Sequence, residues 1–182
     1  MEEIKIRRAK SPDAEMLSEL SRKTFWDAFH QNPKNAPEDM ADYMQTAFNI
    51  EQIKKELSDE KAIFLIAEIE TEAVGYAKII LDSREPKITG EKLVELARLY
   101  SKQKFLGKGI GAKLMEECFE EAERRGCDCM WLGVWEYNPR AQAFYKKYGF
   151  YEVGKHIFQL GSDAQTDILM QKKLINTRAR IC

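Results

Sequence analysis

Apolar residues near the start of the chain recur every three to four positions, which is the spacing of one face of a helix. The first such run follows Ser11-Pro12-Asp13, which offers a serine cap, a proline suited to the first helical position and an early acid. It predicts a helix to about Phe29. A second run over residues 40–47 predicts another helix. Asn49 and Gln52 resemble a capping box, which predicts the start of a third.

Short apolar runs predict strands along the rest of the chain. The runs at 62–69 and 73–81 flank a Glu-Thr-Glu turn and predict an antiparallel hairpin. Further strands are predicted at residues 4–9, 93–100, 129–135, 151–158 and 167–173. Helical patterns occupy residues 113–125, ending before Gly126, and residues 140–148. This alternation predicts a mixed sheet with helices on both faces.

Length and charge limit the classes of function. The 182 residues suit one domain, predicted over residues 1–175 with a short tail at 176–182. The 29 Lys and Arg residues balance 30 Asp and Glu residues, so net charge favours neither nucleic acid nor an anionic membrane as a partner. No apolar stretch approaches the ~20 residues of a membrane span, and no signal run opens the chain.

Four cysteines without a signal run predict reduced thiols and a cytoplasmic location. Cys127 and Cys129 are separated by one residue and lack histidine partners, so they do not match common zinc spacings and we expect no metal. Cys118 falls on the apolar face of a predicted helix, where it is expected to fill the core.

A glycine-rich turn leads directly into the long predicted helix. The turn and the first residues of the helix are Leu106, Gly107, Lys108, Gly109, Ile110, Gly111 and Ala112. The first turn of a helix presents unpaired N–H groups and the positive end of its dipole, so this junction predicts a site for an anion such as pyrophosphate. A tight turn between strand and helix would account for the same glycines.

Three kinds of phosphate site compete for this junction. A Walker loop is excluded because the chain has no Gly-Lys-Ser/Thr string. Gly107, Gly109 and Ala112 match a dinucleotide fingerprint, and Glu136 lies at about the distance of a ribose-binding acid. That fold places its glycine turn after the first strand, however, whereas this turn lies past mid-chain. The third candidate, a coenzyme A pyrophosphate site, is favoured by the residues downstream.

Two segments together carry a family resemblance. LGKGIGAKL at the glycine turn is followed by N-x-x-A-x-x-F-Y-x-K-x-G-F over residues 138–150. In combination they resemble the GCN5-related N-acetyltransferase (GNAT) superfamily, over residues 93–151. VWEYNPRAQAFY, FQLGSDAQTDILMQKKL and the early pattern TFWDAF before EDMADYM resemble the bacterial PaiA-type spermidine/spermine acetyltransferases.

The resemblance implies a largely antiparallel twisted α/β sheet and an acetyl-CoA-dependent N-acetyltransferase. The residues implied to bind the coenzyme are Leu99, Tyr100, Ser101, Leu106, Gly107, Lys108, Gly109, Ile110, Gly111, Ala112, Asn138 and Tyr145. Tyr145 is also implied as the general acid that protonates the coenzyme thiolate. Leu106 stands where the superfamily usually has Gln or Arg, so one polar contact to phosphate is lost while the backbone N–H groups remain.

Acetyl transfer to an amine also requires a proton acceptor. An alkyl ammonium with a pKa near about 10.4 must lose a proton before it attacks, which costs about 4 to 5 kcal/mol at pH 7. Glu95, on the strand ahead of the glycine turn, is the leading candidate for this base, and a solvated strand carboxylate explains it equally well. Glu136, after the neighbouring strand, is the reserve candidate.

Acidic side chains would suit a polycationic amine. Glu38, Asp39 and Asp42 on the second predicted helix, together with Glu136, are candidates to bind it, although a charge cluster is also typical of a solvated helix face. Trp26, Phe29 and Tyr43 could line a pocket for aliphatic or cationic groups, or could pack in the core.

The sequence therefore predicts an enzyme that acetylates a primary amine of a polyamine or another small molecule. Acetylation of protein N-termini or lysines is a variant of this hypothesis. A catalytically weak acyl-CoA-binding sensor with the same phosphate site is an alternative from another class. The expected partner is a small amine, and whether the chain forms a homodimer stays open.

Overall fold

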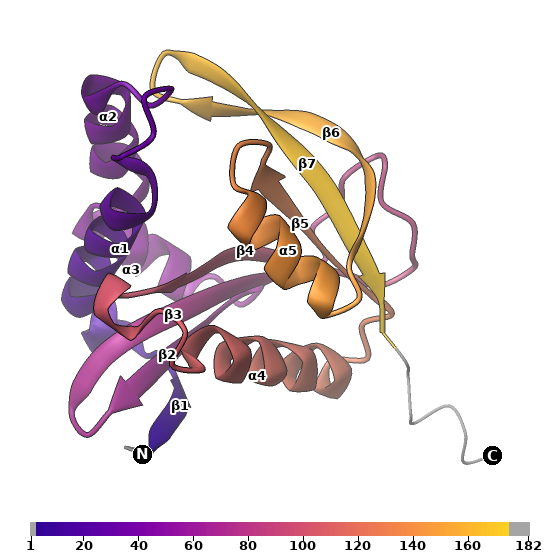
Figure 1. The fold of residues 1–182 in the computed structure, drawn as a ribbon. Coiled ribbons are helices and arrows are strands. Elements are labelled where there is room, and N and C mark those ends of the chain that lie inside the picture. The colour runs from indigo at the N-terminus through magenta and orange to yellow at the C-terminus, as the bar shows by residue number, and fades with distance from the viewer. Residues whose placement is uncertain (1–2, 175–182) are drawn as a thin grey trace.

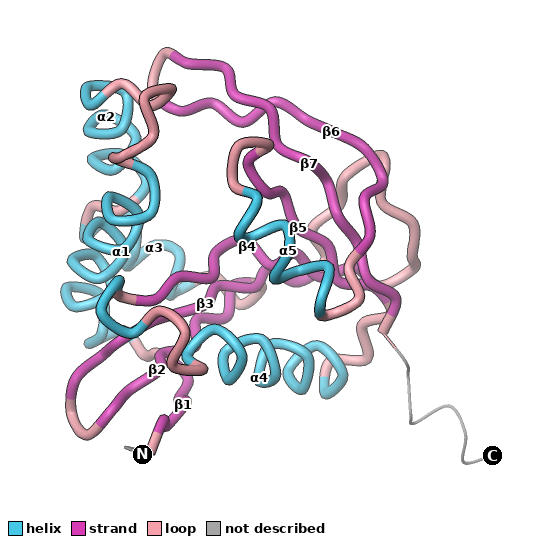
Figure 2. The backbone as a smooth tube through the Cα atoms, viewed as in Figure 1, coloured by secondary structure: helices cyan, strands magenta, loops and turns pink. Residues whose placement is uncertain are grey.

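A computed structural model describes residues 3–174, and Figures 1 and 2 show its elements. The strands are β1 (Ile4–Arg8), β2 (Ala62–Ile69), β3 (Glu72–Leu81), β4 (Leu93–Ser101), β5 (Cys129–Trp135), β6 (Tyr151–Leu160) and β7 (Asp163–Lys173). The α-helices are α1 (Ala14–Phe29), α2 (Pro37–Ala47), α3 (Ile50–Ser58), α4 (Ile110–Arg124) and α5 (Pro139–Lys147). The predicted tail, residues 176–182, lies outside the described residues.

The strands form one sheet in the spatial order β1-β2-β3-β4-β5-β7-β6. Within it β4 and β5 run parallel, and every other neighbouring pair is antiparallel. Helices α4 and α5 cover one face, and α1 and α3 cover the other (Figure 1). The predicted mixed, largely antiparallel sheet with helices on both faces is confirmed. Because the sheet is not doubly wound, the dinucleotide-binding fold is excluded.

The middle of the sheet is buried on both faces because successive side chains of a strand point to opposite sides. In β2, Ile63 and Leu65 pack in one cluster with Leu114 of α4. The alternate residues Phe64 and Ile66 pack on the opposite face, where α1 and α3 lie. Packing on both faces holds β2 and β3 in place. Because β4 pairs with β3, it also positions that edge of β4.

Strands β4 and β5 separate after a short paired stretch. Their pairing covers residues 93–95 of β4 and residues 129–131 of β5. Beyond it, β4 carries a bulge at Ala97, where Leu96 pairs with Ile79 and Arg98 pairs with Lys78 of β3. A bulge bends the strand that carries it and increases its local twist. The continuation of β4 stays with β3, while β5 stays with β7.

Strands β6 and β7 form a longer hairpin than the apolar pattern predicts. The prediction ends one strand at Phe158 and begins the next at Asp167, whereas the structure pairs the strands as far as Leu160 and Asp163. The segment between them is polar, and cross-strand pairing rather than apolar content makes it a strand. The hairpin forms an arm whose tip reaches α2 (Figure 1).

The starts of the first helices differ in detail from the prediction. Residues 11–13 form a short 3-10 turn, and the Asp13 carboxylate accepts a hydrogen bond of 2.7 Å from the Lys10 backbone, so α1 begins at Ala14. Asn49 caps α3 as predicted, because its side chain accepts from the Gln52 amide at 2.8 Å. Among residues 3–174, no helix is both long enough and apolar enough to traverse a lipid bilayer.

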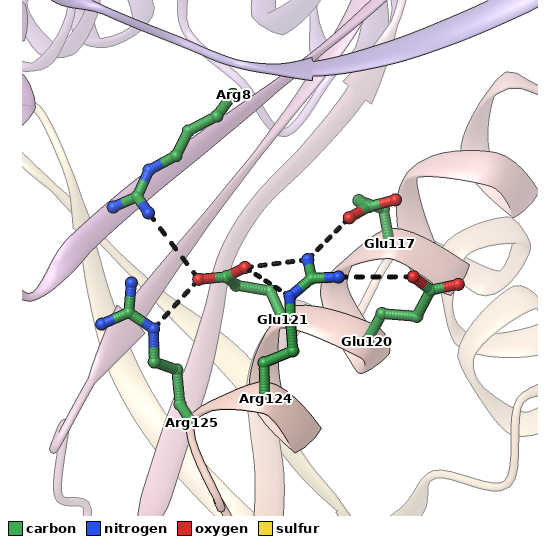
Figure 3. A network of polar contacts seen from close by, with 6 residues as sticks. All are labelled: Arg8, Glu117, Glu120, Glu121, Arg124 and Arg125. Atoms are coloured by element: carbon green, nitrogen blue, oxygen red, sulfur yellow. Dashed lines mark hydrogen bonds and ion pairs between the residues drawn. The ribbon is translucent and has the colours of Figure 1, made fainter.

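The end of α4 is tied down by a cluster of opposite charges (Figure 3). Arg124 contacts three glutamates of its own helix, and the shortest N–O distance, to Glu117, is 2.7 Å. Glu121 also accepts from Arg125 at 3.1 Å and lies 3.8 Å from Arg8 of β1. Burial alone would raise the pKa of Glu121, but the neighbouring guanidinium groups hold it below its usual value. The cluster anchors the end of α4 opposite its glycine turn.

A second ionic cluster is buried between α3 and the sheet. The Glu56 carboxylate accepts from two nitrogens of Arg98, at 2.8 and 3.1 Å, and lies 3.0 Å from the Lys78 ammonium. The three side chains are at most 12% exposed. Burial opposes ionisation of Glu56, yet the two cations hold its pKa below the usual value.

Replacing Glu56 by alanine would leave two cations buried without their carboxylate. We expect Glu56→Ala to lower the free energy of unfolding by about 3 to 5 kcal/mol, measured by urea denaturation at pH 7. Glu51→Ala on the exposed side of the same helix is the control, with an expected change within about 0.5 kcal/mol. Equal losses in the two variants would contradict the role given to the buried cluster.

Candidate active site

The separation of β4 and β5 opens onto a cavity of about 710 Å³. One part of its wall comes from the start of α4 and from α5. The other part comes from α1, the α1–α2 connection and the β6–β7 arm, on the opposite face of the sheet. The two strands line it between these parts, so the cavity joins the two faces of the sheet.

The glycine turn places a group of free backbone donors at the cavity. Gly107 and Gly109 have φ angles of +79° and +88°, a left-handed conformation that side chains disfavour. Gly109 caps α4. Among residues 3–174, no acceptor is hydrogen-bonded to the backbone amides of Gly109, Ile110, Gly111 or Ala112. Unpaired amides at a helix start, backed by its dipole, suit the pyrophosphate predicted here.

Two residues of the turn contribute less than predicted. The Lys108 amide donates to the Phe105 carbonyl at 3.1 Å, and Lys108 is not among the residues that line the cavity. The Leu106 amide donates to the Gln103 carbonyl at 3.1 Å, while its side chain lines the cavity and is exposed. Among the described residues of the turn, the amides of Leu106 and Lys108 are thus already paired, whereas those of Gly107 and of residues 109–112 are free.

The continuation of β4 supplies a second set of backbone groups. Leu99, Tyr100 and Ser101 pair with β3 along one edge, and β5 has already diverged from the other edge. All three residues line the cavity. An extended ligand with amide groups can hydrogen-bond to such an edge as an added strand does. This geometry suits the predicted pantetheine contact.

Helix α5 brings Asn138 and Tyr145 to the same cavity. The Asn138 side chain accepts from the Ala141 amide at 3.1 Å, which confirms that it caps α5. Tyr145 lies one residue after Phe144 on the side of α5 that packs on the core. Burial, with a smaller effect from the nearby Cys118 thiol, raises the pKa of the Tyr145 phenol above its usual value. The phenol is therefore neutral at pH 7 and keeps a proton to donate.

The two predicted base candidates lie away from the cavity. Neither Glu95 nor Glu136 is among its lining residues. The Glu95 carboxylate accepts a hydrogen bond of 2.6 Å from the Ser83 hydroxyl, and the Glu136 carboxylate lies 3.9 Å from the Lys155 ammonium. The structure therefore does not bring the predicted base and Tyr145 to one site.

A different carboxylate, Asp167 of β7, faces the cavity. It is buried, and burial raises its pKa to about 6 although nearby His156 favours its ionised form. A base with a pKa near 6 is ionised at neutral pH. The sequence contains one signal for it, because Asp167 is a charged residue at the start of a predicted strand that continues with Ile168, Leu169 and Met170. The signal is easily missed because the polar segment before Asp167 has the composition of a loop.

The acidic residues predicted to bind substrate, and Trp26, are absent from the lining of the cavity. Glu38 and Asp42 lie on the exposed side of α2, and Trp26 is partly exposed and stacks on His30. Two other carboxylates, Asp27 and Asp167, line the cavity. Aromatic side chains complete this part of the wall, namely Phe25, Phe29, Tyr43, Phe48, Trp135 and Phe158. Of the three predicted aromatics, Phe29 and Tyr43 line the cavity and Trp26 does not.

Comparison with known proteins identifies the family. A sequence model of the acetyltransferase (GNAT) family matches residues 21–150, which is more than half of the chain. The chain belongs to the GNAT family. An uncharacterized N-acetyltransferase of Lactobacillus delbrueckii subsp. lactis is 31% identical over 172 residues, covering 94% of this chain and 98% of the relative.

One further relative of this GNAT chain and one similar solved structure have names that say more than the family. Thialysine N-epsilon-acetyltransferase of Bos taurus is 30% identical over 79 residues, covering 41% of this chain and 46% of the relative. The PaiA N-acetyltransferase of Thermoplasma acidophilum, solved with coenzyme A, has a TM-score of 0.74 at 22% identity, covering 94% of this chain and 99% of the other. The latter likeness confirms the fold.

The GNAT chain is an acetyl-CoA-dependent N-acetyltransferase. Acetyl-CoA supplies the thioester from which the acetyl group is transferred. The residues present fit this cosubstrate, because free amides at Gly109 and beyond can bind a pyrophosphate and the β4 edge can bind amide groups. Tyr145 and Asp167 reach the same cavity from opposite faces of the sheet, so a neutral phenol and a buried carboxylate border one space.

The pyrophosphate site can be tested through its glycine cap. Gly109→Ala forces a side chain into a left-handed conformation, at a cost of about 1 to 2 kcal/mol, and displaces the amides that follow. We expect the Kd for coenzyme A, measured by titration calorimetry, to rise about tenfold. Gly126→Ala, at the other end of α4 with φ +70°, is the matched control and should leave the Kd unchanged. Equal effects on the Kd would contradict the assignment.

The raised pKa of Asp167 predicts a pH-dependent stability. Because the folded-state pKa of about 6 exceeds the ordinary 3.8, the folded chain binds this proton more tightly than the unfolded chain does. Ionisation therefore costs about 3 kcal/mol of stability, which is lost as the pH rises from about 4 to 6. We expect Asp167→Asn to be more stable than wild type by up to that amount at pH 8.

At a pH well below 3.8 the Asp167 side chain is neutral in both states, so Asp167→Asn and wild type should unfold at similar urea concentrations. A stability difference that is the same there and at pH 8 would show that Asp167 is not a buried carboxylate with a raised pKa.

Proposed function

We propose that this chain acetylates a primary amine of a small molecule of the polyamine type, with Tyr145 protonating the departing thiolate. The observation that carries the proposal is the single cavity that joins the coenzyme-binding face to a pocket with carboxylate and aromatic walls. A primary alkylamine with a short aliphatic chain matches both kinds of wall.

Contacts between the β6–β7 arm and α2 close one side of the pocket. At the tip of the β6–β7 arm, the Ser162 amide and hydroxyl donate to the Asp39 carboxylate at 2.6 and 2.8 Å. Nearer the cavity, the Gln165 side chain donates to the Asn35 side chain at 2.8 Å. These contacts join the arm to α2 and the connection before it, so a small amine is accommodated more readily than a protein terminus.

The walls suit a cation separated from the reacting nitrogen by methylene groups. Asp27 and Asp167 provide two carboxylates, the first of which is held by Lys23 at 2.7 Å. The rings of Phe29, Tyr43 and Phe158 lie between α1 and the arm. Aromatic faces attract ammonium groups and cover aliphatic chains. The thialysine acetyltransferase among the relatives also carries the name of an amine substrate.

The proposal is tested by the release of free coenzyme A from acetyl-CoA in the presence of spermidine, spermine, simple alkylamines and a basic peptide. We expect the small amines to accelerate release and the peptide to have little effect. Acceleration by the peptide alone would favour a protein acetyltransferase. Binding of coenzyme A without acceleration by any amine would favour the acyl-CoA sensor.

Tyr145→Phe tests the proton donor with the most active amine. Loss of the hydroxyl should lower kcat about 10- to 100-fold, because general acid catalysis contributes in that range, while the Kd for coenzyme A changes less than about twofold. Tyr137→Phe, an exposed tyrosine that does not line the cavity, is the control with unchanged kcat. A similar kcat in the two variants would contradict the role of Tyr145.

A further inference from the structure

Three ionisable side chains, those of Asp167, His156 and Glu85, form a row that begins at the cavity. Asp167 faces the cavity, and its Oδ2 atom lies 3.8 Å from Nε2 of His156. The other ring nitrogen of His156, Nδ1, lies 3.6 Å from Oε2 of Glu85 in the β3–β4 connection. Both separations are within about 0.6 Å of hydrogen-bond length, and contacts that carry protons commonly tighten when substrate binds.

The strand register creates this alignment. His156 of β6 and Asp167 of β7 are directly paired, so their side chains project from the same face of the sheet. Gly133 on β5 leaves the space they occupy, because a Cβ there would lie 3.0 Å from Nε2 of His156 and 3.1 Å from Oδ2 of Asp167. A larger residue at Gly133 would displace both groups.

His156 is the most exposed member of the row and therefore the one that reaches solvent. Its side chain is 31% exposed, against 13% for Asp167 and 17% for Glu85. Tyr43 of α2 also acts electrostatically with Asp167, and because burial raises the pKa of its phenol, it is neutral. On the outer side, Lys87 donates to the Lys155 carbonyl beside His156. An imidazole can accept a proton on one nitrogen and release one from the other.

Building on the proposed acetylation of a small amine, we infer that Asp167 is the catalytic base and that His156, oriented by Glu85, returns its proton to solvent. Asp167 contacts the amine, and His156 and Glu85 act through Asp167. This assignment replaces Glu95, whose carboxylate is held by Ser83 outside the cavity.

The proton balance requires such an outlet. The substrate ammonium first gives one proton to Asp167, which holds it while the neutral nitrogen attacks the thioester carbon. A C–N bond forms and the C–S bond breaks, and Asp167 then passes its proton through His156 to water. Tyr145 gives its hydroxyl proton to the sulfur and regains one from solvent as the nitrogen releases its second proton. The net products are the amide, free thiol and one proton.

The dependence of kcat/KM on pH distinguishes this base from an enzyme that selects neutral amine. With Asp167 ionised, wild-type kcat/KM should stay level from about pH 6 to 9, because the bound ammonium is deprotonated by the enzyme. In Asp167→Asn only the neutral amine reacts, so kcat/KM should rise about tenfold per pH unit over this range. The loss at pH 7 is expected to be about 100-fold or more.

Two variants complete the kinetic test. Glu95→Gln should keep the level profile of wild type, and a level profile in Asp167→Asn with a sloping one in Glu95→Gln would overturn the assignment. Glu152→Gln, an exposed carboxylate of β6, controls for a change of one charge and should leave kcat/KM unchanged.

The relay through His156 has its own readout. His156→Ala should lower kcat about tenfold at pH 7, and added imidazole should restore most of it by occupying the vacated space. Glu85→Gln should lower kcat less, with the level pH profile retained. If imidazole does not restore the kcat lost in His156→Ala and the pH profile of kcat/KM is unchanged, His156 has a structural role and not a proton-transfer role.

A measurement without turnover separates this inference from the proposed function. The chain has two histidines, so the ring signals of His156 can be assigned in NMR spectra by comparison with His156→Gln. They should respond to protonation of Asp167 near pH 6 in wild type and lose that response in Asp167→Asn. Absence of the response would overturn the pairing, whereas its presence with no amine acetylated would refute the proposed function alone.

Discussion

The separation of β4 from β5 is the constraint on which the rest of the structure depends. The two strands share a short parallel pairing, after which the bulge at Ala97 turns β4 to remain with β3. Their facing edges then have backbone groups without strand partners, which the fold must satisfy with a ligand or water. The glycine turn and α5 lie at this opening, so the cost of parting the strands creates the site for an extended, amide-containing ligand.

Two buried carboxylates on the same face of the sheet differ in how fully their charge is compensated, and this difference separates a stabilising group from a reactive one. Glu56 is surrounded by Arg98 and Lys78, so its charge is compensated and it holds α3 against the strands. For Asp167, the ion-pair partner among residues 3–174 is His156, at 3.8 Å, and burial raises the pKa of the carboxyl to about 6. A carboxylate without full compensation costs stability, and that same deficit makes it a better proton acceptor at neutral pH.

Local sequence signals predicted most of the elements and the glycine turn before α4. Helical spacing located α1 and α2, Asn49 marked the start of α3, and the glycines before Ile110 marked the turn whose amides are free. The sequence predicted strand boundaries less well where pairing with another segment, rather than local composition, determines whether a residue is in a strand. The polar stretch before Asp167 became part of a long hairpin because β6 pairs with it, which no local pattern indicates.

By itself, the sequence determined the order of strands and helices, the left-handed glycine turn and the motif that places Tyr145 on α5, because these depend on residues close together in the chain. Only the tertiary structure decided which carboxylates line the same cavity as Tyr145. Glu95 precedes the bulge and lies beside Ser83, whereas Asp167 is brought to the cavity by pairing between strands far apart in sequence. Side-chain direction in a sheet follows register, and register is set by contacts across the whole fold.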